Sequence, residues 1–201
     1  NGVGEVPAGD PRNGLKVDHT YTFNVESADD LEGFTIEYCT SAFAYLSGAD
    51  SVNACTGPTG FDASNWDGGT VTVTNVTNGN DTETFDVAVP NDSPSNNYVE
   101  LTTAGSALPV DANDQLVIAF PATETEYFTN PTVIGTFFAT IMTYDDDAEA
   151  EAGTPAIDTG TTTSSTTESI SIYTRVQETL NFSVEGEDGS VAGPTDEDPG
   201  S

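Results

Sequence analysis

Residues 15–25 alternate strictly between apolar and polar side chains, and this alternation restricts the fold more than any other feature of the chain. In LKVDHTYTFNV one face carries Leu15, Val17, His19, Tyr21, Phe23 and Val25. A period of two predicts a β-strand with one buried face. No window of the chain shows a sustained helical period, and FDASNW at 61–66 is expected to form one helical turn at most.

The same period recurs along the chain, and turn-forming residues separate the runs. The runs are GFTIEY, GTVTVTNV, ETFDVAV, NYVELTT, DQLVIAF, GTFFATIMTY, ESISIYTRV and ETLNFSV. The segments between them are rich in Gly, Pro, Asn and Asp, which favour turns. About nine strands with short connections predict an all-β fold, namely a single antiparallel β-sandwich of the Greek-key or jelly-roll type.

The expected core consists of apolar residues on the inward parity of these strands. They are Phe23, Phe34, Ile36, Val73, Phe85, Val87, Leu116, Ile118, Phe120, Phe137, Ile141, Ile172, Leu180 and Phe182. The sandwich is expected to span residues 15–185. An extended N-terminal arm at 1–14 and an acidic C-terminal tail at 186–201 flank it, because both are rich in Gly, Pro and acids and poor in apolar residues.

The charge of the chain excludes several classes of partner. Its 201 residues include 34 acids and only 3 lysines and arginines, for a formal net charge of −31. Such a surface cannot offer the cationic patch that nucleic acids need, and anionic membranes repel it. No apolar run is long enough to cross a bilayer. Acid-rich, lysine-poor surfaces stay soluble at high salt, so we expect a protein that is secreted into a saline habitat, at the cell surface or beyond it.

Cys39 and Cys55 are the two cysteines, and three roles are open to them. A zinc site needs four ligands, and His19 is the one histidine available. A thiol nucleophile needs a base and a cationic setting, which this acidic chain disfavours. A disulfide would close a loop of about fifteen residues and stabilise the fold by about 3 kcal/mol. The exported setting favours the disulfide.

Four segments resemble, in the same order, a family of secreted β-rich surface proteins from small-genome, candidate-phyla bacteria. They are EYC with ACTGPTGFDAS, YFTNPTVIGTFFATIMTY, PAIDTGT and VQETLNFSV, and the resemblance covers roughly residues 19–184. It implies an exported role in a surface layer or appendage and no enzymatic activity. The chain departs from the family in its extreme acidity and its low lysine content.

Neither catalysis nor a cofactor is expected, because no pair of carboxylates stands out and the one tryptophan, Trp66, is expected to anchor a loop. The acidic run at 145–151 includes Asp145, Asp146 and Asp147, whose carboxylates are candidate Ca²⁺ ligands. The spacing of an EF-hand is absent, so a solvated acidic loop is the favoured interpretation. His19 is expected to pack in the core.

Four sequons are candidate glycosylation sites, at Asn75, Asn80, Asn91 and Asn181. Asn181 lies in the last predicted strand and Lys16 in the first, which is the arrangement of an intramolecular Lys–Asn cross-link. Both have the parity of the solvent face, so a solvated lysine is favoured instead.

Two functions compete at this stage. The first is the structural subunit of an extracellular filament or pilus-like appendage that assembles with copies of itself by β-strand donation. The alternative is a monomeric adhesin, a carbohydrate-binding module or a surface-layer component that contacts a host or neighbouring cell. The long first strand and its extended arm favour donation, with Val3, Val6, Leu15 and Val17 as candidate contacts. Which end of the chain donates the strand stays open.

Overall fold

The computed structural model describes residues 14–42, 55–79, 81–90, 96–152 and 156–167. Contacts along the chain separate a unit that ends at Ser169 from Ile170–Ser201, so every described residue belongs to the first unit. The predicted strands ESISIYTRV and ETLNFSV, with Ile172, Leu180 and Phe182, lie outside the described residues.

The elements, in chain order, are β1 Lys16–Val17, β2 His19–Asn24, β3 Asp29–Leu31, β4 Gly33–Cys39, η2 Ser64–Trp66, β5 Thr70–Asn75, β6 Asp81–Ala88, β7 Tyr98–Thr103, β8 Leu108–Val110, β9 Gln115–Phe120, β10 Phe128–Thr129, β11 Gly135–Tyr144, α1 Asp147–Ala152 and β12 Thr159–Thr166.

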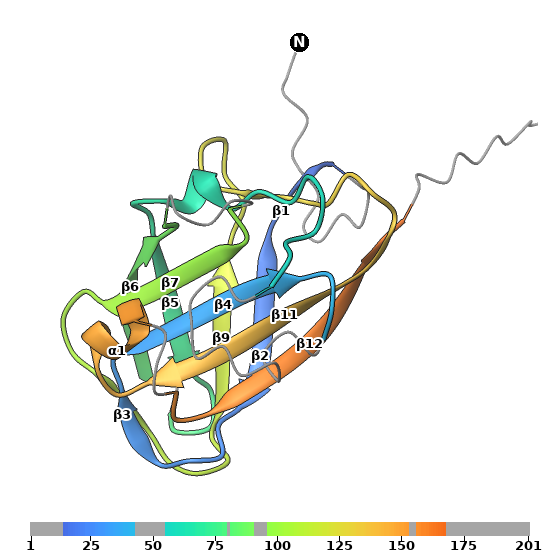
Figure 1. The fold of residues 1–201 in the computed structure, drawn as a ribbon. Helices are drawn as coiled ribbons and strands as arrows, with labels where there is room; N and C mark the ends of the chain where they lie inside the picture. The colour runs from blue at the N-terminus through green and yellow to red at the C-terminus, as the bar shows by residue number, and fades with distance from the viewer. Residues whose placement is uncertain (1–13, 43–54, 80, 91–95, 153–155, 168–201) are drawn as a thin grey trace, which may run out of the picture. The chain divides into compact units, whose positions relative to one another are not determined.

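Eight of these strands form one antiparallel sheet in the order β12-β11-β4-β7-β6-β5-β9-β2 (Figure 1). Strands β5, β6 and β7 follow one another as neighbours, and β9 then returns to lie beside β5. This is the strand order of a Greek key. Two short pairs, β1 with β10 and β3 with β8, extend the structure at its ends. The all-β prediction is confirmed.

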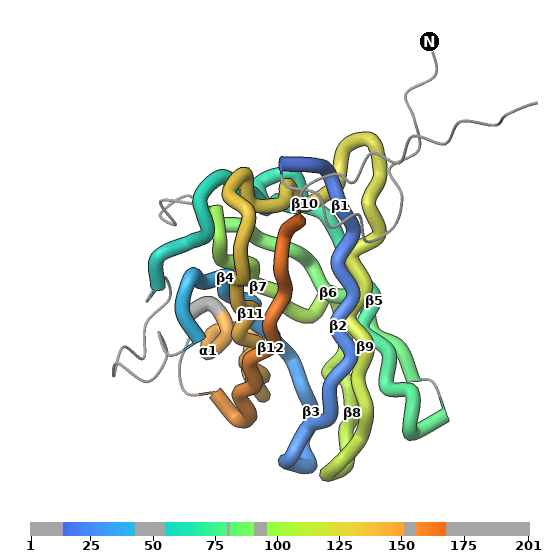
Figure 2. Tube along the Cα trace, turned by 90° about the vertical axis from the view of Figure 1, so that its right-hand side faces the viewer, coloured from blue at the N-terminus to red at the C-terminus, as the bar shows by residue number. Residues whose placement is uncertain are grey.

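The expected sandwich of two separate sheets is not confirmed, because one sheet provides most of the enclosure. The sheet curls until its two edge strands, β12 and β2, run side by side (Figure 2). The right-handed twist between neighbouring strands accumulates over eight strands and brings the edges together. The two edges are not paired with each other in the sheet.

The core fills the concave side of this sheet, as the alternation predicts. The predicted core residues that are described are buried, with the exception of Phe23, which is half-buried. Aromatic rings occupy the centre, where Trp66 and Phe120 meet edge to face at 5.2 Å between centroids. FDASNW at 61–66, for which the sequence predicts at most one helical turn, contains a three-residue 3-10 helix at Ser64–Trp66. Trp66 anchors this loop in the core, where it is buried.

The long first strand predicted at 15–25 is divided in two. Residues 16–17 pair with β10, whereas β2 starts at His19 and pairs with β9. The chain changes partner at Asp18 because Val17, which is 1% exposed, packs into the domain's own core beside Phe128. The apolar alternation of this segment is therefore satisfied within one chain.

The six-residue helix α1 was not expected from the sequence. It begins after Asp146, whose carboxylate accepts a hydrogen bond from the backbone N–H of Ala148 at 2.7 Å. Acids in the first turn and alanines further on suit a short helix. Ala150 is fully buried and packs with Met142 and Tyr144. One buried alanine leaves no apolar stripe for a periodicity argument to detect.

Replacing Gly33 with alanine is expected to destabilise the domain. A Cβ at this position would collide with the Cβ of Ala150 in α1 and lie 3.3 Å from the carbonyl oxygen of Leu101. We expect Gly33→Ala to lower the free energy of unfolding by about 1–3 kcal/mol, measured by urea denaturation. Gly105→Ala is the matched control, since a Cβ there meets nothing within 4 Å. Equal stabilities of the two variants would contradict the close packing of α1 on the sheet.

Candidate functional site

A groove of about 590 Å³ lies between the two edge strands of the curled sheet. One wall is β2 with the two residues that follow it, up to Glu26, and the other is Asp158 with much of β12. Both views show these strands side by side (Figure 1, Figure 2). The groove therefore follows the line along which the sheet would close into a barrel.

The groove has an apolar base and polar rims, whose acids, Glu26 and Asp158, lie outside the two strands. Tyr21, Phe23, Val25 and Ile141 contribute the apolar side chains, and Phe23 remains partly exposed. All the residues of β12 except Thr166 are exposed, although such a strand would normally bury one face. The side of β12 that faces the groove thus has nothing packed against it among the described residues.

Asp158 holds the two edges together at one end of the groove. Its carboxylate accepts hydrogen bonds from the backbone N–H groups of Glu26 at 2.8 Å and Ser27 at 3.0 Å, and from the Ser27 hydroxyl at 3.0 Å. Residue 158 comes immediately before β12, and residues 26–27 follow β2. This clasp sets the separation of the edge strands where the groove begins.

The described lining of the groove contains no cysteine, histidine, lysine or arginine, and its two acids are Glu26 and Asp158. Asp158 is committed to the clasp. What the lining offers instead is two strand edges and a row of apolar side chains. Backbone N–H and C=O groups at such edges pair with an added strand.

Behind the groove, three polar side chains form a hydrogen-bonded network in the aromatic core. The Tyr21 hydroxyl donates to the Tyr38 hydroxyl at 2.7 Å, and His19 Nδ1 lies 2.9 Å from the same Tyr38 oxygen. The His19 ring stacks on Phe128 at 4.5 Å between centroids. The prediction that His19 is a packed and hydrogen-bonded core residue is confirmed.

Burial lowers the pKa of His19 to about 4, against the opposing influences of Asp18 and of a hydrogen bond to the Asn130 side chain, which favour the protonated ring. The residue keeps some exposure as a whole, but its ring lies among aromatic neighbours. Burial also raises the pKa values of Tyr21 and Tyr38, so both hydroxyls stay protonated. The network is neutral at pH 7 and has no group that exchanges a proton there.

The neutral His19 should make stability depend on pH. The unfolded chain binds a proton near the ordinary pKa of 6.5, and the folded chain does so only near 4. The contribution of His19 is therefore complete above pH 6.5 and is lost as the pH falls towards 4. We expect His19→Gln, which hydrogen-bonds without titrating, to remove on the order of 2 kcal/mol of this loss. The free energy of unfolding of both proteins is measured from pH 7 to pH 4.5. If it falls by the same amount in both, His19 does not cause the pH dependence.

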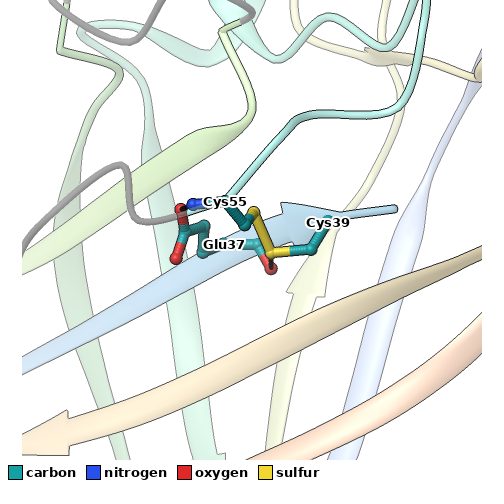
Figure 3. A group of neighbouring side chains, drawn as sticks. All are labelled: Glu37, Cys39 and Cys55. Carbon is teal, nitrogen blue, oxygen red and sulfur yellow. Dashed lines mark hydrogen bonds between the residues drawn. A yellow bond between two sulfur atoms is a disulfide. The ribbon is translucent and has the colours of Figure 1, made fainter. Parts of the chain in front are cut away.

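Cys39 and Cys55 form a disulfide, as predicted (Figure 3). Glu37 lies beside it, and its Oε1 accepts a hydrogen bond from the backbone N–H of Cys55 at 3.1 Å. These three residues bring carboxylate and sulfur atoms close together. The sulfur atoms are bonded to each other and cannot ligate a metal as thiolates. The cluster instead fixes the end of the loop that returns from β4.

Two of the three aspartates proposed as Ca²⁺ ligands, Asp146 and Asp147, have structural partners of their own. Asp147 accepts hydrogen bonds from the backbone N–H and hydroxyl of Thr103, at 2.9 Å and 3.1 Å, and Asp146 caps α1. Burial, together with Asp145 and Asp146, raises the pKa of Glu149. Among the described residues, the carboxylates of Asp145, Asp146 and Asp147 do not belong to any group of three ligand atoms close enough to share a metal ion. The geometry ties α1 to β7 and outlines no cation site.

Among the four sequons, Asn75 lies within the described residues, and its side chain is inaccessible. It is fully buried, and its amide donates to Asp114 Oδ2 at 2.7 Å. The Asp114 carboxylate also accepts the backbone N–H of Asp111 at 2.9 Å, and these bonds lower its pKa. Glycosylation of Asn75 would require this turn to open. Asn80, Asn91 and Asn181 lie outside the described residues.

Of the residues predicted to contact a neighbouring subunit as donor-strand contacts, two lie outside the described residues and two lie within them. Val3 and Val6 lie outside the described residues, Leu15 is half-buried, and Val17 is buried in the domain's own core. Lys16 is exposed, and its Nζ lies 3.8 Å from the centre of the Tyr127 ring. This cation–π contact occupies the lysine at the surface, in agreement with the solvated interpretation.

Sequence reasoning missed β12, which forms one whole side of the groove. TGTTTSST has no large apolar residue, so it lacks the alternation used to find the other strands. Its one positive signal is the run of β-branched threonines, which favour strands. The pairing of all eight residues with β11 establishes the strand.

No protein-family model matches the chain, and comparisons with curated proteins and with solved structures gave no match. Among the described residues, no helix is both long and apolar enough to span a membrane. The disulfide is typical of proteins that fold in an oxidising environment, such as the cell exterior.

Proposed function

We propose that this chain is the structural subunit of an extracellular filament, and that copies of it assemble by β-strand donation. The observation that carries the proposal is the character of the two sheet edges. β12 reads TGTTTSST and β2 reads HTYTFN, so neither contains an acid or a lysine in a chain with 34 acids. Monomeric β-proteins protect exposed edges with charges, prolines or bulges.

The groove between these edges adds a second reason. It offers apolar side chains at its base and, along both rims, strand edges that pair with no other described strand. These are the two things that an added strand uses. Main-chain hydrogen bonds supply the affinity, and alternate side chains of the donated strand occupy the base. Contacts of this kind carry no charge, so the net repulsion between subunits is least harmful there.

The adhesin and carbohydrate-binding alternatives have weaker support. A sugar-binding surface usually presents exposed aromatic rings beside polar groups. The large hydrophobic residues that are exposed in the described part of the chain are the aliphatic Val76, Val133 and Ile134. Most of the described aromatic side chains pack in the core, and Tyr127 pairs with a lysine. Phe23 and Phe138 are only partly buried, but neither belongs to the exposed residues.

The proposal is tested by assembly of the full chain at about 1 M salt, where charges are screened within about 3 Å. We expect filaments by negative-stain microscopy. Thr162→Lys introduces a charge on β12 inside the groove and should abolish them, whereas Thr163→Lys, one residue further on the same strand but outside the groove lining, should not. Thermal unfolding of both variants confirms that the domain is folded. A wild-type protein that stays monomeric under these conditions would refute the proposed function.

A further inference from the structure

We propose that the strand filling the β2–β12 groove is residues 170–184 of a second copy of this chain. This inference rests on the proposed function and adds the identity of the donor. It is carried by the groove on one side and by the sequence that follows β12 on the other.

Residues 170–184 form a long run in which one parity is mostly apolar and is interrupted by Thr174 and Glu178. Ile170, Ile172, Val176, Leu180, Phe182 and Val184 share one parity. Neither glycine nor proline occurs between Gly160 in β12 and Gly186. The two strands predicted at 168–176 and 178–184 keep the same parity, so together they can form one extended strand with a mostly apolar face.

The segment between β12 and this run favours donation to a neighbour over a return to the same groove. A chain that reverses next to its own strand needs a tight turn, and such turns favour Asn-Gly, Asp-Gly or other glycine-containing pairs. Residues 166–169 read TTES and contain none of these. Fifteen extended residues also span about 50 Å, roughly twice the length of the eight-residue β12. The run has the reach to leave one domain and enter another.

The run also matches the chemistry of the groove. It contains one arginine, Arg175, and one glutamate, Glu178, so it has no net charge in a chain of −31. Its apolar parity suits a base that includes Phe23 and Ile141. The antiparallel order makes β2 and β12 run in opposite directions, so one inserted strand lies parallel to one edge and antiparallel to the other. A single donated strand can thereby pair with both rims.

The N-terminal arm suits the groove less well. Val3 and Val6 are separated by three positions, so they face opposite sides of a strand. Pro7 and Pro11 lack the N–H groups that a sheet ladder needs. Val17 is already used within the domain.

The first test compares two substitutions in the full chain at about 1 M salt. Leu180→Asp puts a second acid beside Glu178 on the mostly apolar face of the run, where insertion would bury it without a cationic partner. We expect it to reduce pelletable filament at least about tenfold. Thr179→Asp adds the same charge on the opposite face and should leave assembly within a factor of about two. If Leu180→Asp assembles like the wild type while Thr162→Lys does not, the groove accepts a strand from elsewhere, and this inference fails while the proposed function stands.

The second test identifies the source of the strand by cross-linking. One protein carries Thr162→Cys in β12, and the other carries a cysteine at Thr174, Val176 or Glu178 in turn. A disulfide between the two mixed proteins is expected for at least one position, and none for the control Tyr173→Cys on the other face. A third protein carries Thr162→Cys and one of these cysteines in the same chain. If a disulfide forms within this protein at high dilution, and none forms between the two mixed proteins, the run fills its own groove and the inference is overturned. Failure of the wild type to assemble overturns the proposed function as well.

Discussion

The domain is expected to lose its fold when salt is removed and to regain it when salt is restored. A sphere of the folded radius with a charge of −31 has an electrostatic self-energy on the order of tens of kcal/mol at 0.01 M salt. Domains are stable by only about 5–15 kcal/mol. Unfolding spreads the same charges over a larger volume, so repulsion dominates at low salt. At about 1 M salt the screening length falls to about 3 Å, and core burial prevails.

Thermal unfolding followed by circular dichroism from about 0.01 M to about 1 M NaCl measures this effect. The midpoint should rise steeply over the first tenfold increase and then level off. Sucrose is the control, because it strengthens burial without screening charge. If the midpoint does not change with NaCl, or if sucrose raises it equally, charge repulsion does not limit the stability of the domain. That result would also contradict the expectation of a saline habitat.

Removal of the disulfide is expected to lower the free energy of unfolding by about 3 kcal/mol. The bond joins Cys39 at the end of β4 to Cys55, and the closed loop restricts the unfolded chain. Cys55 also donates its backbone N–H to Glu37, which is only 4% exposed. If the loop detaches, that buried carboxylate loses a partner.

The double variant Cys39→Ser/Cys55→Ser, compared with the wild type by urea denaturation at high salt, measures this loss. Wild type treated with a reductant should match the variant, which separates the bond from the substitutions. Maleimide should label no thiol in the denatured, unreduced wild type. Full labelling would contradict the disulfide, and equal midpoints would show that β4 and the core hold the loop without it.

Alternation predicted most of the described strands and their buried faces, because burial on one side of a strand imposes a period of two. Phe34, Ile36 and Phe85 show the success of this rule, since each is fully buried. Phe23 shows its limit. It has the parity of the core, but its strand is at an edge of the sheet, and a groove rather than a neighbouring strand lies beside it.

Sites that depend on two distant segments escaped the same reasoning. Asn75 in a sequon looks accessible until Asp114 is placed beside it. Asp158 lies in the segment PAIDTGT, where nothing in the local pattern indicates a partner, yet its carboxylate binds residues 26 and 27, more than a hundred positions away. Local patterns contain no information on which turns meet in space.

The sequence by itself predicted most of the described strands with an apolar face and most of the described core, and it favoured the pairing of the two cysteines. Hydrophobic period and covalent chemistry are properties of short stretches and need no knowledge of neighbours. The tertiary structure alone decided that the sheet curls, that TGTTTSST is a strand, and that β2 and β12 become its edges. Twist accumulates over all eight strands, so no single segment encodes where the edges meet. The groove, which is the candidate site, therefore depends on the twist accumulated over the whole sheet.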